Sequence, residues 1–290
     1  MTLAIQVLFA SLTNGCVYVL IGLGIVLCYR SSRVVNLAHG ETYSLCGLTA
    51  AKLVLVGIPF AIAAPCGVVA AVVGALLFER LALRSRLHWN PQRLIIVAVG
   101  VALLVEGLFQ VFLGSGTYQI PSMLSGPSLL LKGAAISRQG ALAVGLAFVI
   151  TGAMVWFFRS TLLGQAMTAC AENPNVSATL GVNVARMRQL SYGAAGAIGG
   201  LTALLIVPLT GVSFDSGLSI TLNGFLTAAL ANMTHPGRTL WAGMVLGLCE
   251  GIVGGYWNPL YEVPIVLGGV LLVGVAYLSR GARFGGALRA

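Results

Sequence analysis

The chain has 290 residues, of which 58% are hydrophobic and only 8% are charged, and its mean hydropathy is +0.96. This balance leaves too little polar surface for two or three soluble domains, and it predicts a membrane protein. The formal net charge is +9, but the basic residues lie between apolar runs and form no continuous patch with interleaved aromatic residues, which argues against nucleic-acid binding.

Apolar runs of membrane-spanning length recur along the chain, each close to the roughly 20 residues that a helix needs to cross a bilayer. The first run holds no charged residue and is followed, not preceded, by Arg30, so it is predicted to be a retained span and not a cleaved signal. The candidate spans are 3–29, 38–56, 58–78, 94–113, 140–158, 189–209, 217–233, 239–257 and 263–279. The predicted fold class is all-α: one transmembrane domain over residues 1–290, a polytopic helical bundle of about 8 to 9 spans.

The second and seventh of these spans contain polar residues and are candidates for broken or re-entrant segments. His39 and Glu41 open the second, while Asn223 and Asn232 interrupt the seventh. Polar groups in a span are costly and usually face the bundle interior or a water-filled path. Two interpretations stay open: these residues line a translocation path, or they pack and cap helices. The candidates for the substrate path are Asn36, His39, Gly40, Glu41 and Asn223.

Glycine is the residue that points to close helix packing. It supplies 38 of the residues, without a collagen period. In lipid, helices associate through van der Waals contact, and small residues let their backbones approach. Gly196, Gly199 and Gly200 are therefore expected to face a neighbouring helix.

Basic residues divide unevenly between the two sides of the predicted bundle. One side receives 13 of the 16 Lys and Arg residues, and the other receives Lys52, Lys132 and Arg138. Cytoplasmic loops collect basic residues, so the N-terminus is predicted to lie outside and the C-terminus in the cytoplasm. The segment 114–139 then falls on the outer side, as a loop with short structure.

The longest inner connection, about residues 159–188, has the pattern of two short helices. Residues 162–172 have helical composition, and a second helix over 174–180 is predicted because Asn173 suits an N-cap, Pro174 the first helical position and Gly181 the residue after the end. A helix of two turns is not stable alone in water, so it must pack on something. A cytoplasmic partner is one candidate, and the helical bundle itself is the other.

Glu106 and Glu250 lie within apolar runs, so their carboxyl groups are predicted to be buried in the bundle. They either relay protons or, as expected for two carboxylates without regularly spaced partners, form interhelical hydrogen bonds. The sequence contains no His-Glu-x-x-His, Gly-x-Ser-x-Gly or phosphate-loop motif, and its cysteines show no metal-ligand spacing. No catalytic residue, cofactor or metal site is predicted.

Several segments resemble one family of transport proteins. Asn36-Leu37-Ala38-His39-Gly40-Glu41, Glu79-Arg80 and the inner segment 161–183 are similar to the branched-chain amino acid permeases of high-affinity ABC uptake systems, of the LivH type. The resemblance runs from about residue 11 to about residue 285. Leu37 stands where the family has Phe, and 231–238, Ala-Asn-Met-Thr-His-Pro-Gly-Arg, replaces its Gly-rich turn.

The resemblance implies the permease subunit of an ABC importer in a bacterial inner membrane, without enzymatic activity of its own. The implied partners are a second permease, two cytoplasmic ATP-binding subunits that hydrolyse ATP, a periplasmic or lipid-anchored solute-binding protein, and membrane lipid. The solute would be a branched-chain or other amino acid, urea, an amide or a small acid. Residues that match the family's coupling region, which docks on the ATPase, are Ala171, Glu172, Asn173, Pro174, Leu180 and Gly181. An ion-coupled secondary transporter remains the alternative, with Glu106 and Glu250 as its ionisable groups.

Overall fold

A computed structural model describes residues 2–86, 90–124, 126, 129–131, 134–256 and 268 of the chain. In this part, α-helices dominate, with one π-helical segment η1 (Phe78–Leu83), one 3-10 turn η2 (Arg84–Arg86) and two short strands, β1 (Leu129–Leu131) and β2 (Ala134–Ile136). The α-helices are α1 (Thr2–Ser32), α2 (Glu41–Leu55), α3 (Phe60–Leu77), α4 (Pro91–Leu113), α5 (Arg138–Ser160), α6 (Leu162–Glu172), α7 (Pro174–Thr179), α8 (Val184–Thr210), α9 (Ser216–Leu230) and α10 (Pro236–Tyr256).

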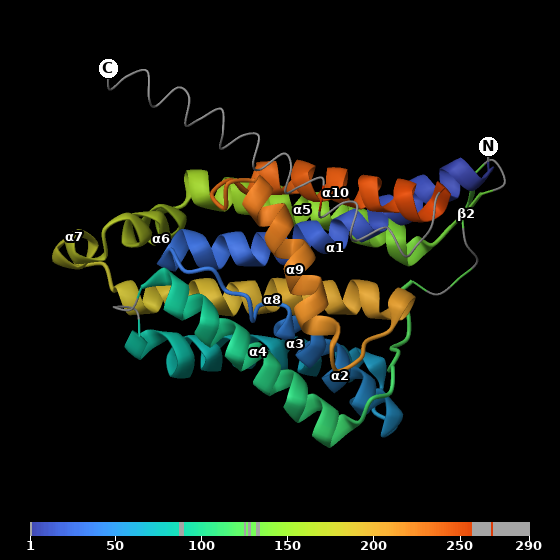
Figure 1. Cartoon of the computed structure of the whole chain (residues 1–290), viewed down its shortest axis with the longest axis horizontal. Coiled ribbons are helices and arrows are strands. Elements are labelled where there is room, and N and C mark those ends of the chain that lie inside the picture. Colours follow the sequence, from blue (N-terminus) through green and yellow to red (C-terminus); the bar gives the residue numbers. More distant parts are fainter. Residues whose placement is uncertain are drawn as a thin grey trace, which may run out of the picture.

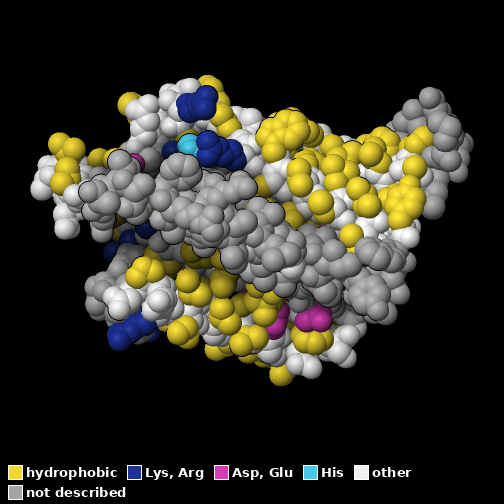
Figure 2. Space-filling model, turned by 45° about the horizontal axis from the view of Figure 1, so that its top comes forward, with side chains coloured by type: hydrophobic (Ala, Val, Ile, Leu, Met, Phe, Trp, Pro, Cys, Tyr) yellow, Lys and Arg dark blue, Asp and Glu magenta, His cyan; other side chains and the backbone are white. Residues whose placement is uncertain are grey.

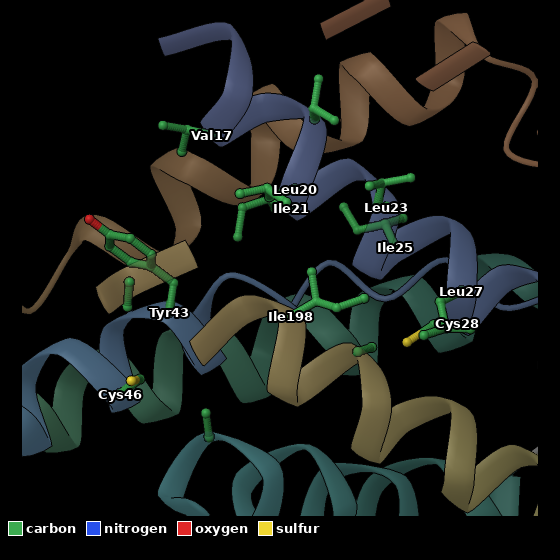
Figure 3. Close-up of a cluster of buried hydrophobic side chains, with 14 of the residues drawn as sticks. Val17, Leu20, Ile21, Leu23, Ile25, Leu27, Cys28, Tyr43, Cys46 and Ile198 are labelled. Atoms are coloured by element: carbon green, nitrogen blue, oxygen red, sulfur yellow. The ribbon is translucent and has the colours of Figure 1, made fainter. Parts of the chain in front are cut away.

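Helices α1 and α8 form the centre of the bundle. Helix α1 packs against α5, α8, α9 and α10, and Figure 1 shows α9 crossing obliquely in front of α1 and α8. The most apolar stretches of α1 and α8 are 78% and 72% buried, compared with 22–28% for α3, α4 and α5. Leu20, Leu23 and Ile25 of α1 belong to the core, together with residues of other helices such as Tyr43 of α2 and Ile198 of α8 (Figure 3). The peripheral helices therefore turn apolar side chains outward, as helices in lipid do.

Within the described residues, 6 helical segments are long and apolar enough to cross a membrane. They are α1, α3 with its continuation to Arg86, α4, α5, α8 and α10. The chain is thus a multi-pass helical membrane protein, and the predicted fold class is confirmed. The count of eight to nine spans stays a prediction, because α2 and α9 have only 15 residues each and the span predicted over 263–279 lies outside the described residues except for Gly268.

The predicted second span, 38–56, is shorter in the structure: α2 is continuous from Glu41 to Leu55 and is preceded by a non-helical segment. After α1 the chain turns at Arg33, which has a φ of +56°, and residues 33–40 are not helical. They run back along the bundle before α2 begins (Figure 1). The predicted seventh span is also shortened: α9 ends at Leu230, just before Asn232 and Met233 adopt positive φ angles of +62° and +55°.

The glycines of α8 lie at the closest helix contacts. A Cβ atom added to Gly196 would meet Ala75 Cβ of α3 at 2.8 Å, and one added to Gly199 would overlap Thr42 Oγ1 of α2. These positions leave no room for a side chain. The prediction that Gly196, Gly199 and Gly200 face neighbouring helices is confirmed, since Gly200 also approaches α3.

The segment 114–139 carries short structure, as predicted. Strands β1 and β2 pair antiparallel, with Leu129 opposite Ile136. Tyr118 and Val212 exchange two backbone hydrogen bonds of 2.8 Å, which tie this segment to the end of α8.

Candidate functional site

The first turns of α2 and α9 meet near the centre of the bundle. The backbone amide of Gly40 donates a hydrogen bond of 2.8 Å to Thr221 Oγ1, which in turn donates to the carbonyl of Gly217. A Cβ atom at Gly40 would overlap both the carbonyl oxygen of Gly217 and Thr221 Oγ1. Only glycine fits at position 40, so two segments 181 residues apart in sequence are held in direct contact.

Two carboxylates lie beside this junction. Glu41 is 6% exposed and its carboxylate lies against Gly217, where an added Cβ would come within 2.6 Å of its Oε2. Glu106 of α4 accepts a 3.3 Å hydrogen bond from the amide of Leu218. Both acidic groups thus lie at the start of α9, where the unpaired amides of a helix carry partial positive charge. Among the described residues, neither oxygen of Glu41 has a hydrogen-bond partner.

His39 and Asn36 fix the non-helical segment that leads to the junction. His39 is 1% exposed and fills the space that Gly24 of α1 leaves, since a Cβ at Gly24 would overlap the imidazole ring. Its carbonyl accepts a 2.7 Å hydrogen bond from Thr42 Oγ1. Asn36 Oδ1 accepts from the amide of Ala38 at 3.1 Å. Part of each residue's role is therefore capping and packing, the second of the two interpretations of the sequence.

A small cavity adjoins this junction on the side of α3 and α4. It measures about 60 Å³, and its lining includes Asn36, Glu41 and Thr42 together with Val101 and Val105 of α4. The structure thus brings Asn36 and Glu41 together at this cavity, with Gly40 at the adjoining junction. His39 lies against Gly24 of α1 and does not line the cavity. Asn223 is half-buried further along α9, where its carbonyl accepts from Thr227 Oγ1, and it does not line this cavity.

The predicted coupling residues lie on or next to α6 and α7, which project from one end of the bundle (Figure 1). Asn173 Oδ1 accepts a 3.1 Å hydrogen bond from the amide of Val176, and Pro174 takes the first helical position. Gly181, with φ of +84°, ends the helix: its amide and that of Val182 donate to the carbonyls of Ala178 and Ser177. The prediction of a capped helix is confirmed, with its last residue at Thr179 and Leu180 as its C-cap.

Four apolar side chains of this helical pair are exposed: Leu162 by 85%, Leu180 by 78%, and Leu163 and Val176 to a smaller degree. Ala171 is half-buried, while Glu172, Asn173, Pro174 and Gly181 are exposed. Exposed apolar side chains on a segment that projects from the bundle are unfavourable in water unless something covers them.

The family model described as branched-chain amino acid transport system / permease component matches residues 7–276. The chain belongs to this permease family. It is 26% identical over 285 residues to the high-affinity branched-chain amino acid transport system permease protein LivH of Escherichia coli (strain K12), covering 93% of this chain and 92% of that protein. It is 25% identical over 287 residues, with the same coverage, to the permease protein BraD of Pseudomonas aeruginosa. The family resemblance seen in the sequence is confirmed.

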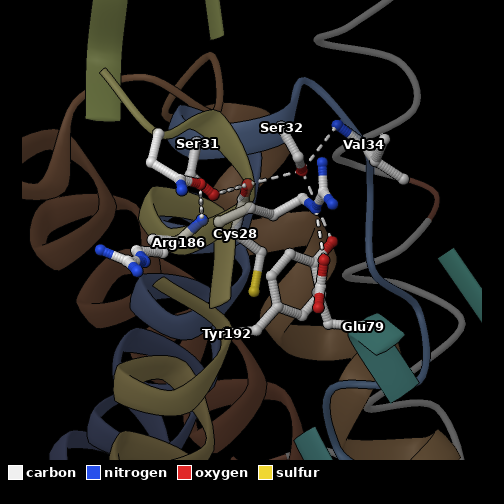
Figure 4. Close-up of polar contacts among 9 residues, drawn as sticks. Cys28, Ser31, Ser32, Val34, Glu79, Arg186 and Tyr192 are labelled. Carbon is white, nitrogen blue, oxygen red and sulfur yellow. Dashed lines mark hydrogen bonds and ion pairs between the residues drawn. The ribbon is translucent and has the colours of Figure 1, made fainter. Parts of the chain in front are cut away.

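This member of the permease family has a buried ion pair that sequence reasoning missed. Arg188 Nε of α8 lies 2.5 Å from Glu79 Oε1 of η1, with side-chain exposures of 7% and 0%. Tyr192 stacks on Phe78 at 6.1 Å between ring centroids, and Figure 4 shows Glu79 beside Tyr192. The pair ties the end of α3 to the first turns of α8. Residues 109 positions apart carry no sequence signal that would have paired them.

Glu250, the second acidic residue within the permease's apolar runs, also has a hydrogen-bond partner. Glu250 of α10 accepts a hydrogen bond from the hydroxyl of Tyr18 in α1. Together with the bond from Leu218 to Glu106, this matches the interhelical hydrogen bonds expected for these carboxylates. Within the described residues, no cluster of three His, Cys, Asp or Glu side chains is placed to hold a metal ion.

Proposed function

We propose that the chain is the translocation subunit of an ABC importer that moves a small polar or amphipathic solute across the bacterial inner membrane. The observation that carries the proposal is the projecting pair α6 and α7, whose capped helices expose Leu162 and Leu180. In a permease-family member, this surface has the character of a docking site for a cytoplasmic ATPase. ATP would be hydrolysed by that partner.

A chain of packed contacts connects the docking surface to the central junction. Arg30 of α1 donates a 3.0 Å hydrogen bond to Thr168 Oγ1 of α6, and the Glu79–Arg188 pair fixes the start of α8. Further along α8, Gly199 lies against Thr42, directly after the residues of the junction. A displacement of α6 and α7 would therefore reach α2 through rigid, closely packed helices.

The substrate path in this proposal passes the junction of α2 and α9. Asn36, His39, Gly40, Glu41 and Asn223 are its proposed lining. Short helices whose first turns meet inside the bundle offer partial positive charge, and the buried carboxyl group of Glu41 offers a hydrogen-bonding group without a partner among the described residues. Such a site suits a small solute with a negatively charged or polar group, as an amino acid has. The names of the relatives, which specify branched-chain amino acid transport, support that class.

The proposed orientation places α6 and α7 in the cytoplasm and the N-terminus outside. Arg80, Arg84, Arg159 and Arg186 gather at the same end of the bundle as α6 and α7, which fits the rule that cytoplasmic ends carry basic residues. The proposed assembly contains a second permease, two ATP-binding subunits and a solute-binding protein on the outside.

The test is substrate-stimulated ATP hydrolysis by the complex reconstituted in lipid, with Leu180→Asp in this chain. A charge in the apolar interface should abolish stimulation or prevent assembly, because a buried unpaired carboxylate is strongly unfavourable. Leu180→Met, which keeps the apolar surface, should retain both. Leu124→Asp places the same charge on an exposed leucine of the 114–139 segment and should have little effect.

If Leu180→Asp assembles and couples like the native chain, α7 is not the docking element. Transport by this chain alone, without ATP, would overturn the importer proposal as a whole. In that case the carboxylates Glu106 and Glu250 would be the next positions to substitute.

A further inference from the structure

A second cavity, of about 360 Å³, lies at the end of the bundle that carries α6 and α7. It is formed by the last turns of α5, the first turns of α10 and the end of α1. Its lining includes Arg30, Phe158, Arg159, His235, Arg238 and Trp241. It is separate from the central junction, and Arg30, one of its lining residues, also takes part in the contacts between α6 and the rest of the bundle.

The charge of this cavity is strongly positive. Arg30 stacks over Phe158, with its guanidinium carbon 4.0 Å from the ring centroid, and bonds to Thr168. Arg159 and Arg238 are exposed, and neither forms an ion pair with any residue that the structure describes. Glu172 of α6 interacts electrostatically with Arg30 and opposes only part of this charge. The positive end of the α10 dipole adds to it.

The cavity opens beside the apolar outer surface of α5 and α10. Trp241 is 68% exposed and lies one turn from Arg238, and Trp156 is 64% exposed near Arg159. Figure 2 shows basic side chains beside a histidine at one end of the molecule and an apolar surface that continues away from them. Tryptophan side chains favour the level of the lipid headgroups, so these two place the cavity at the membrane boundary.

We propose that this cavity binds the phosphate of an anionic phospholipid in the cytoplasmic leaflet, with the acyl chains along α5 and α10. Arginines recognise phosphate through paired N–H groups, and basic pockets between helices at this level suit such headgroups. A free phosphate offers the same charge, but only a lipid also covers the apolar surface below the cavity. The inference depends on the proposed function only for the side of the membrane.

A bound headgroup would also affect α6. Arg30 contributes to the cavity and donates to Thr168 Oγ1, so an anion there would hold Arg30, and with it the start of the docking element, in place. Lipid composition would then alter the order of α6.

The test uses the purified full-length chain in detergent, titrated with phosphatidylglycerol or phosphatidylcholine while thermal unfolding is followed. Phosphatidylglycerol should raise the Tm and phosphatidylcholine should not. In the double variant Arg159→Gln/Arg238→Gln, the phosphatidylglycerol concentration that gives half of the Tm increase should rise about 30-fold. The control, Arg84→Gln with Arg186→Gln, removes two exposed arginines from the same end of the bundle, away from the cavity, and should respond like the native chain.

If the two double variants weaken the response to phosphatidylglycerol equally, the proposal is overturned, because the lipid would then bind through net charge and not through this cavity. The same Tm increase with inorganic phosphate at the same concentration would overturn the lipid as the occupant. If the double variant does not fold, as judged by circular dichroism, Arg159→Gln alone should show about a fivefold weakening, and no change would refute the site. None of these outcomes requires an ATPase partner, so they are independent of the importer proposal.

Discussion

The buried pair of Glu79 and Arg188 gives the sharpest prediction about stability. In Glu79→Gln, Arg188 would remain 7% exposed and lose its counterion. Removing one partner of a buried ion pair costs about 3–5 kcal/mol, compared with about 0–1 kcal/mol for an exposed pair. For a chain of this size, we expect the Tm to fall by roughly 10 °C.

The assay is thermal unfolding of the purified chain in detergent, followed by circular dichroism. The matched control is Glu172→Gln, which removes the same charge from an exposed position on α6 and should change the Tm by little. In Glu79→Met with Arg188→Met, no charge is left unpaired, and most of the lost stability should return.

Two results would contradict this reasoning. If Glu79→Gln lowers the Tm no more than Glu172→Gln, the pair does not lie in a buried environment. If the double Met variant is as unstable as the single variant, the loss comes from packing around Tyr192 and not from an unpaired charge.

Three further predictions concern the junction and the inner helices. Gly40→Ala should prevent stable folding or lower the free energy of unfolding by at least about 1–3 kcal/mol, because it overpacks the junction. Gly145→Ala, at a position with open space around it, should leave the stability unchanged. Thermal unfolding measures both effects. Asn173→Ala should cost about 1 kcal/mol and speed hydrogen exchange in the first turn of α7, and unchanged exchange would refute the cap. Burial raises the pKa of the Cys170 thiol, so less of it is thiolate at pH 7. It should therefore react with a water-soluble maleimide much more slowly than a cysteine introduced by Asn175→Cys at an exposed position of α7. Equal reaction rates would contradict the burial of Cys170.

Local signals in the sequence predicted the parts of the structure that depend on local chemistry. Asn173, Pro174 and Gly181 determined the limits of α7 to within one residue, because a cap is defined by side chains and φ angles of neighbouring residues. The apolar runs predicted the long helices, since hydrocarbon thickness sets their length.

Contacts between distant segments were not predictable in the same way. Nothing around Gly40 indicates that Thr221 accepts its amide hydrogen bond, and nothing around Glu79 indicates Arg188. The range 38–56 also overestimated the second helix, because the hydropathy of a run does not show that residues 37–40 form a turn before α2 begins at Glu41.

The non-helical segment before α2 has a consequence for how the protein is made. Residues 34–40 are not helical, and an unsatisfied backbone group in hydrocarbon costs several kcal/mol. The amide of Gly40 donates its hydrogen bond to Thr221, which leaves the ribosome long after it. We therefore expect this segment to reach its final position by packing against α9, and not by partitioning into lipid alone. Its integration would be completed only after α9 has been synthesised.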